Sequence, residues 1–110
     1  MSEESPRDAL ARRVRDVLSS HADVREVNMF GCRAFMVDDR LAVGARGEGA
    51  LLVRADPADF DDLQRRGAEQ ASMRSGRPMG AGWLDVPPSR LDDDAELAFW
   101  VRIGLGAKPE

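Results

Sequence analysis

The sequence predicts an α+β domain in which three helices pack on an antiparallel sheet of about five strands. Two observations lead to this prediction. Three stretches carry apolar residues at the three- and four-residue spacing of an amphipathic helix, and each begins at a residue suited to capping. Between them lie short runs rich in Val, Leu and Met, which are bounded by Gly, Pro and Asp turns. The expected order is helix, three or four strands, helix, one or two strands, helix.

Length and composition agree with one globular domain. A chain of 110 residues buries roughly 60–70% of its unfolded surface, which is enough for one modest core. Hydrophobic residues make up 43% and charged residues 33% of the chain, and no apolar run approaches the roughly 20 residues that span a bilayer. The acidic, polar first residues lack the pattern of an export signal, so a cytoplasmic protein is expected. We expect one domain over residues 1–110, with loose ends at 1–4 and 106–110.

A first helix is expected from residue 6 to about residue 20. Ser5 is placed to cap it, and Pro6 suits the first helical position, where no amide hydrogen is needed. The apolar stripe of this helix needs a sheet to cover. Its members are Leu10, Val14, Val17 and Leu18.

Four short strands are expected after this helix. Apolar runs alternate with Gly and acidic turn residues, and Gly47 and Gly49 tolerate the backbone of a tight turn at little cost. We therefore expect an antiparallel meander with strands at residues 24–30, 34–37, 40–44 and 50–54.

The second half of the chain repeats the cap pattern twice. Asp56-Pro57 predicts a helix over residues 58–66, which Gly67 ends. Strands are expected at 71–74 and 82–86. Asp93 and Glu96 have the spacing of a capping box, so a closing helix is expected to about residue 105. Its inward stripe is Leu97, Trp100 and Val101.

Alternation along the strands predicts a sheet that is apolar on both faces. Residues two apart point to the same side of a strand. A sheet of this kind needs cover on both sides, from its own helices or from a second copy, so self-association as a homodimer is one expected arrangement. One set of positions comprises Phe35, Val37, Leu51, Val53, Leu84 and Val86, and the alternating set includes Met36, Leu52 and Trp83.

An ordered series of blocks between about residues 25 and 105 resembles the TfoX N-terminal domain family. The specificity of the resemblance comes from the order of the blocks rather than from any one of them. The blocks are Met29-Phe30-Gly31, Phe35-Met36-Val37-Asp38, Leu51-Leu52-Val53-Arg54, Gly76-Arg77-Pro78-Met79, Gly82-Trp83 and Leu97-Ala98-Phe99-Trp100-Val101.

This resemblance implies a cytoplasmic bacterial domain without catalytic residues. In two-domain members, called TfoX or Sxy, it belongs to regulators of competence for DNA uptake that act with the cyclic-AMP receptor protein at promoters. Those regulators carry a second, C-terminal domain, whereas this sequence ends at Glu110, so a stand-alone N-terminal domain is expected. Cys32 stands where the family commonly has a second Gly after Met-Phe-Gly, which reduces backbone freedom there.

The candidate surface for a partner or ligand comprises Phe30, Gly31, Arg77, Met79 and Trp83. A guanidinium beside an aromatic face suits the binding of a carboxylate, a phosphate or a protein. The alternative is structural, with the stem of Arg77 packed over Trp83 and with Phe30 in the core. The structural alternative is favoured for these residues taken one by one.

The other reactive residue types are scarce. Cys32 and His21 are the single cysteine and histidine, so an internal disulfide is excluded and a zinc site would need carboxylates for nearly all its ligands. Arg33 would lower the pKa of the thiol, but neighbouring strand residues point to opposite faces, so an inert thiol is favoured. A capping or solvated role is favoured for His21, which lies at the end of a predicted helix. We expect no catalytic group, no metal and no cofactor.

Two acidic clusters are candidates for a hard cation such as magnesium or calcium. Both lie in the first turns of predicted helices, where carboxylates are favoured by the helix dipole, so a solvated face is favoured over a cation site. The clusters are Asp59, Asp61 and Asp62, and Asp92, Asp93 and Asp94.

Three functions from different classes follow from these observations. The leading one is a non-enzymatic regulatory or protein-binding domain. The second is a small-ligand-binding protein or enzyme with a cleft near Phe30, Arg77 and Trp83. The third is direct nucleic-acid binding through Arg12, Arg13 and Arg15, which the net charge of −4 opposes. We expect neither direct nucleic-acid binding nor a membrane role.

Overall fold

A computed structural model of the chain describes residues 5–21, 23–29, 32–71 and 82–106. Within these residues the chain forms three α-helices and a six-stranded antiparallel sheet, which confirms the α+β prediction. The order is one helix, four strands, a second helix, two strands and a third helix. None of the described helices has both the length and the apolar character that a membrane span requires.

Three helical segments begin at the caps that the sequence predicts, although Asp56 caps a 3₁₀ turn at residues 57–59, and the α-helix expected at 58–66 begins only at Phe60. Ser5 Oγ accepts a hydrogen bond from the Asp8 N–H at 3.1 Å, and a carboxylate at each of the other two caps accepts one from the residue two positions on. Each cap satisfies an amide that the first helical turn leaves unpaired. The helices are α1 (Pro6–Val17), α2 (Phe60–Arg65), which follows the 3₁₀ turn η1 (Pro57–Asp59), and α3 (Asp94–Gly104), which follows the 3₁₀ turn η2 (Pro88–Arg90).

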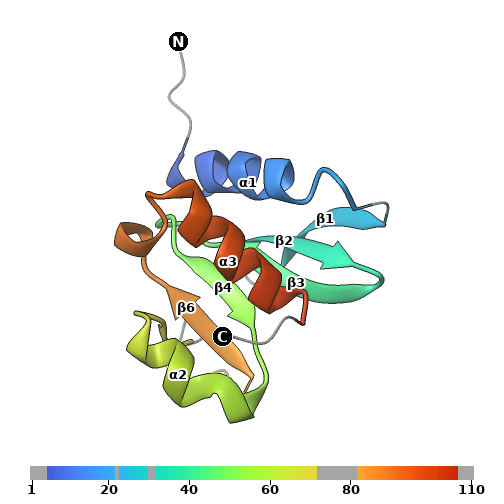
Figure 1. The fold of residues 1–110 in the computed structure, drawn as a ribbon. Coiled ribbons are helices and arrows are strands. Elements are labelled where there is room, and N and C mark those ends of the chain that lie inside the picture. The colour runs from blue at the N-terminus through green and yellow to red at the C-terminus, as the bar shows by residue number, and fades with distance from the viewer. Residues whose placement is uncertain (1–4, 22, 30–31, 72–81, 107–110) are drawn as a thin grey trace.

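The strands form one sheet in the order β1-β2-β3-β4-β6-β5, and all neighbours are antiparallel. Figure 1 shows α1 and α3 across one face of this sheet, with α2 beside β6. The bounds are β1 (Val24–Met29), β2 (Cys32–Val37), β3 (Arg40–Ala45), β4 (Leu51–Arg54), β5 (Glu69–Gln70) and β6 (Trp83–Val86).

The structure corrects three predicted boundaries. α1 ends at Val17 instead of near residue 20, because tight turns follow it and the two serines at 19 and 20 are weak helix formers. β2 starts two residues earlier than predicted, where Cys32 pairs with Met29. Of the strand expected at 71–74, Ala71 is not in a strand and residues 72–74 lie outside the described residues, whereas the strand β5 at Glu69–Gln70 was not predicted. Pairing with β6 decides this strand, whatever its local propensity.

The register separates the two faces of the sheet. The helix face carries the row of paired residues Glu26, Phe35, Val43, Val53 and Leu84. Phe35, Val43, Val53 and Leu84 are fully buried in the main core with residues of α1 and α3, as the alternation predicts. The helix residues of this core are Leu10, Ala11 and Val14 from α1, with Leu18 just after it, and Leu97, Trp100, Val101 and Ile103 from α3.

The opposite face carries the row Val27, Ala34, Gly44, Leu52, Asp85 and Glu69. A small second cluster lies on this face, in which Cys32, Leu52 and Ala71 are buried and Trp83 packs against them. The prediction that both faces are apolar is therefore confirmed at these positions, although Met36 is only half-buried. Self-association as additional cover stays a prediction.

Candidate functional site

The structure describes one of the five residues of the predicted partner or ligand surface. Trp83 is the first residue of β6, pairs with Arg54 of β4 and packs on the second cluster, so its ring belongs to a filled contact. The other four residues of that surface lie outside the described residues, and their role stays a prediction: Phe30, Gly31, Arg77 and Met79.

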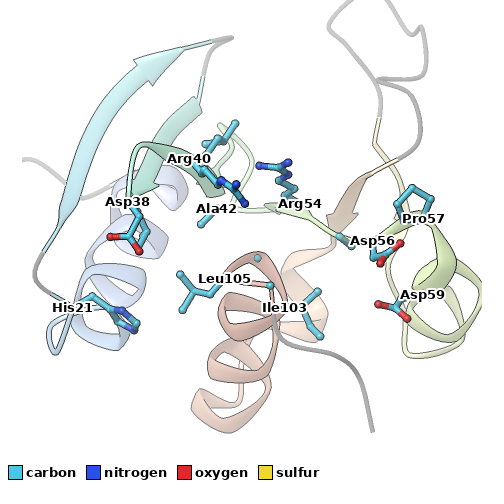
Figure 2. Close-up of a pocket in the computed structure, with 15 residues that line it drawn as sticks. His21, Asp38, Arg40, Ala42, Arg54, Asp56, Pro57, Asp59, Ile103 and Leu105 are labelled. Carbon is cyan, nitrogen blue, oxygen red and sulfur yellow. The ribbon is translucent and has the colours of Figure 1, made fainter.

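The structure contains a cleft of about 740 Å³ that the sequence did not indicate. It lies where the β2–β3 turn, the end of β4, the turn η1 and the C-terminal end of α3 meet (Figure 2). Trp83 does not line it. The charged or titratable groups around the cleft are His21, Asp38, Arg40, Arg54, Asp56 and Asp59.

Gly104 sets the shape of the cleft by bringing α3 close to β3. A Cβ atom at this position would lie 2.5 Å from the Ala42 carbonyl oxygen and 2.5 Å from Val43 Cγ1. These separations are well inside van der Waals contact, so only glycine lets the helix end pack directly on the strand backbone. Ile103 and Leu105, on either side of it, form an apolar floor (Figure 2).

A strained turn forms one rim of the cleft. Asp38 and Asp39 connect β2 to β3 with φ of 53° and 65°. This left-handed conformation twists a two-residue hairpin turn correctly, and aspartate tolerates it better than most residues. The Asp39 carboxylate accepts a hydrogen bond from Arg25 Nη2 at 3.0 Å. Asp38 is left at the cleft, where its side chain lies toward His21 (Figure 2).

Two exposed arginines line the cleft. Arg40 pairs with Val37 at the start of β3, and Arg54 pairs with Trp83 at the end of β4, so the Arg54 side chain leaves the sheet on the face opposite to α3. Within the part of the chain that the structure describes, neither forms an ion pair or a side-chain hydrogen bond. Two unpaired cations at the rim of a cleft that also has apolar lining can attract an anionic group. On the other side of the cleft, Asp56 accepts a hydrogen bond from the Ala58 N–H at 3.0 Å as the cap of η1.

A second charged feature, an ion pair, lies on the opposite face of the sheet. Arg46 Nη1 donates to both carboxylate oxygens of Asp85, at 2.9 and 2.8 Å. Both side chains are about four-fifths buried, at 20% and 19% exposure. Burial raises the pKa of the Asp85 carboxyl, and the hydrogen bond from Arg46 opposes that rise. This pair could not be found from sequence, because it joins residues that meet only through the β3–β4–β6 register.

Cys32 is a buried thiol beside this ion pair. It is 3% exposed, and burial raises its pKa, which outweighs the lowering by the Arg46 charge. A thiol with a raised pKa is a poor nucleophile, as expected from the sequence. Arg33, which follows Cys32 in β2, points to the helix face instead, where its Nη1 lies 3.6 Å from Glu26 Oε1.

The remaining candidates have structural positions. His21 is exposed at the cleft, and its backbone N–H bonds to the Leu18 carbonyl in the turn after α1. The two acidic clusters lie at the starts of α2 and α3, as predicted. Among the described residues, no group of three or more His, Cys, Asp or Glu side chains is placed to hold a metal ion.

The fold and the cleft together define a small α+β domain that carries helices on one face of an antiparallel sheet. The model of the TfoX N-terminal domain matches residues 16–108, which is nearly the whole chain. The chain belongs to the TfoX N-terminal domain family, and the resemblance in its sequence is confirmed. Neither a curated protein nor a solved structure matched it.

Proposed function

We propose that this chain is a cytoplasmic regulatory domain of a bacterium, which acts by binding another protein and not by catalysis. The observation that carries the proposal is membership of the TfoX N-terminal domain family across residues 16–108. The proposed role is that of the N-terminal domain in TfoX-type competence and transcription regulators.

Affinity capture from the native cell tests this role. The tagged chain should recover a specific protein partner, and combined Arg77→Ala and Trp83→Ala substitutions should abolish recovery. Phe99→Ala is the matched control, because Phe99 is a half-buried aromatic that stacks on Arg66 at 3.7 Å on α3, whereas Trp83 lies on the other face of the sheet. Thermal unfolding of each variant separates lost binding from lost folding. Recovery of no partner by the folded wild-type chain would contradict the proposal.

A second candidate function is the binding of a small anionic molecule in the cleft. The specific observation is that two exposed arginines, Arg40 and Arg54, line the same cleft as the apolar residues Ile103 and Leu105. A library of carboxylates and phosphate esters should contain ligands that raise the unfolding midpoint. Arg40→Ala and Arg54→Ala should each remove that rise, whereas Arg102→Ala, an exposed arginine of α3 outside the cleft, should keep it. An unmoved midpoint across the library would rule this function out.

A further inference from the structure

The two edges of the sheet differ in length and in exposure. β5 forms one edge and has two residues, whereas β1 forms the other and has six. β1 pairs with β2 along its whole length, and within the described residues no strand pairs with its outer side. At such an edge every second residue points its N–H and C=O groups outward, ready to pair with another strand.

The side chains of β1 leave this edge open to a partner strand. Proteins usually protect an edge with proline, a bulge or an unpaired charge. β1 contains no proline, its register with β2 is continuous, and its two charged residues already have partners. Arg25 bonds to Asp39 at 3.0 Å, and Glu26 accepts bonds of 2.6 and 2.7 Å from Arg15.

Val27 lies at the centre of the edge. It is 36% exposed and is the one exposed large hydrophobic residue in the part of the chain that the structure describes. Across β1 and β2 it pairs with Ala34, which is fully buried, so the opposite face is apolar where it reaches the edge. Antiparallel pairing with a further strand would cover Val27 and the outward backbone groups together.

We propose that β1 pairs antiparallel with β1 of a second copy of this chain, about a two-fold axis at Val27. The two sheets then form one continuous sheet, and the helices of both copies lie on the same side. The inference extends the proposed interaction role to a second copy of the chain. It names a surface separate from the cleft and from Trp83.

Symmetry and charge select this register. A two-fold axis perpendicular to the sheet keeps each face on its own side, so opposed residues share a face and the axis passes through one residue. An axis at Arg25 or Glu26 would set that residue against its own copy, and directly opposed like charges destabilise a strand pair. Glu26 is ionised at neutral pH, because its ordinary pKa of 4.5 is already far below 7 and the hydrogen bond from Arg15 lowers it further.

An axis at Val27 avoids these repulsions. Val27 then faces its own copy, Glu26 faces Asn28, and Arg25 faces Met29, so residues 25–29 all pair. An axis at Asn28 would pair only residues 27–29 within the strand. The contact is smaller than the roughly 1,200 Å² of a standard interface, so the dimer is weak and depends on concentration.

Sedimentation across a concentration series measures the predicted dimer. The wild-type chain should pass from monomer to dimer as concentration rises. Val27→Arg places two positive charges at the axis and should raise the dissociation constant at least about tenfold. Glu69→Arg puts the same charge on β5 at the other edge and should leave the constant unchanged.

Disulfide trapping tests the register. In a Cys32→Ala background, single cysteines are placed by Arg25→Cys, Glu26→Cys, Val27→Cys and Asn28→Cys. The axis brings residue 27 opposite its own copy at a distance that a disulfide spans, so Val27→Cys should cross-link fastest. Sedimentation of the background variant verifies that it dimerises as the wild type does.

Three outcomes would overturn the inference. They are a wild-type chain that stays monomeric at every concentration, a dimer whose dissociation constant Val27→Arg does not change, and cross-linking that is fastest at a position other than 27. Partner capture by Val27→Arg separates the two proposals. If the wild-type chain is monomeric but still recovers a different protein, the proposed function holds and the edge pairing fails. If it dimerises as predicted but recovers no other protein, the edge pairing holds and the proposed function fails.

Discussion

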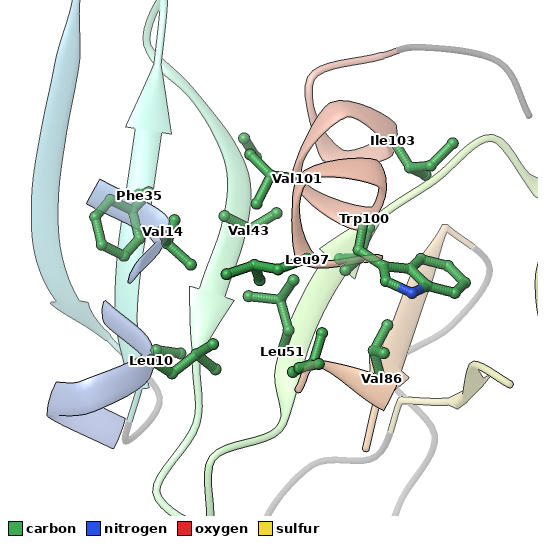
Figure 3. Close-up of a cluster of buried hydrophobic side chains, with 14 of the residues drawn as sticks. Leu10, Val14, Phe35, Val43, Leu51, Val86, Leu97, Trp100, Val101 and Ile103 are labelled. Atoms are coloured by element: carbon green, nitrogen blue, oxygen red, sulfur yellow. The ribbon is translucent and has the colours of Figure 1, made fainter. Parts of the chain in front are cut away.

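Both faces of the sheet carry buried apolar residues, but the two faces are built differently. On the helix face, Leu51 and Val43 meet Leu97 and Trp100 of α3 in a continuous core (Figure 3). On the opposite face the described cluster has three buried residues, and an ion pair lies beside it. The helix face therefore carries most of the hydrophobic stabilisation, whereas the opposite face combines apolar and charged groups.

The largest predicted effect is the difference in stability loss between alanine substitutions at two neighbouring leucines. Leu51 and Leu52 are adjacent in β4, are 0% and 2% exposed, and point to opposite faces. Leu51→Ala should cost about 4 kcal/mol, because the large core cannot collapse around the cavity, and Leu52→Ala about 2 kcal/mol. Urea unfolding measures both. Equal losses would show that the faces contribute alike.

Alanine substitutions at two glycines, one packed on each face of the sheet, test how tightly the two faces are packed. A Cβ at Gly104 would meet the Ala42 carbonyl oxygen at 2.5 Å, whereas at Gly44 it would meet Cys32 Sγ at 3.1 Å. Gly104→Ala should cost about 2 kcal/mol, because backbone must move, and Gly44→Ala about 1 kcal/mol, because a side chain yields more easily. Gly47→Ala is the control, since a Cβ there has no neighbour within 4 Å. A Gly44→Ala loss larger than that of Gly104→Ala would reverse the ranking.

The smallest predicted effect concerns two carboxylates, Glu26 and Asp85, whose contributions to the free energy of unfolding should change with pH in opposite directions. Arg15 lowers the pKa of Glu26 below its ordinary 4.5, on the helix face. Its contribution to stability is full above that unfolded value and is lost as pH falls through the folded pKa. On the opposite face, burial raises the pKa of Asp85 above its ordinary 3.8. The folded chain binds that proton more tightly, so stability rises as pH falls through the folded pKa.

Unfolding free energies measured across acidic and neutral pH for two variants compare these carboxylates. The difference between wild type and Glu26→Gln should shrink on acidification, whereas wild type should gain stability relative to Asp85→Asn. Slopes of the same sign would show that the two faces do not differ in this way. Arg65→Gln, at an exposed ion pair with Asp62, serves as a control for general charge effects.

Local patterns predicted most of the fold. Ser5 and Asp93 cap α1 and α3 as predicted, Asp56 caps the turn η1 that leads into α2, and Gly67 follows the end of α2 with φ of 113°. These features depend on hydrogen bonds and steric limits within a few residues, so they are visible in the sequence. The short strand β5 was not predicted, because its position depends on pairing with β6 and not on its own residues.

The candidate site could not be predicted in the same way. The cleft joins residues from α3, the β2–β3 turn and the end of β4, which are distant in sequence. Gly104 is a helix end in the sequence, and its contact with Ala42 appears only after packing. The Arg46–Asp85 pair likewise requires the register of three strands.

The sequence by itself determined the α+β class, the caps and the apolar alternation, because these follow from short-range sterics and periodicity. It also carried the family resemblance in its ordered blocks. Only the tertiary structure decided the order of the described strands, the position of β1 at a sheet edge and the cleft that Ile103 and Leu105 line. These features depend on contacts between segments that are distant in sequence, and local residue patterns do not specify which segments pair or in which alignment.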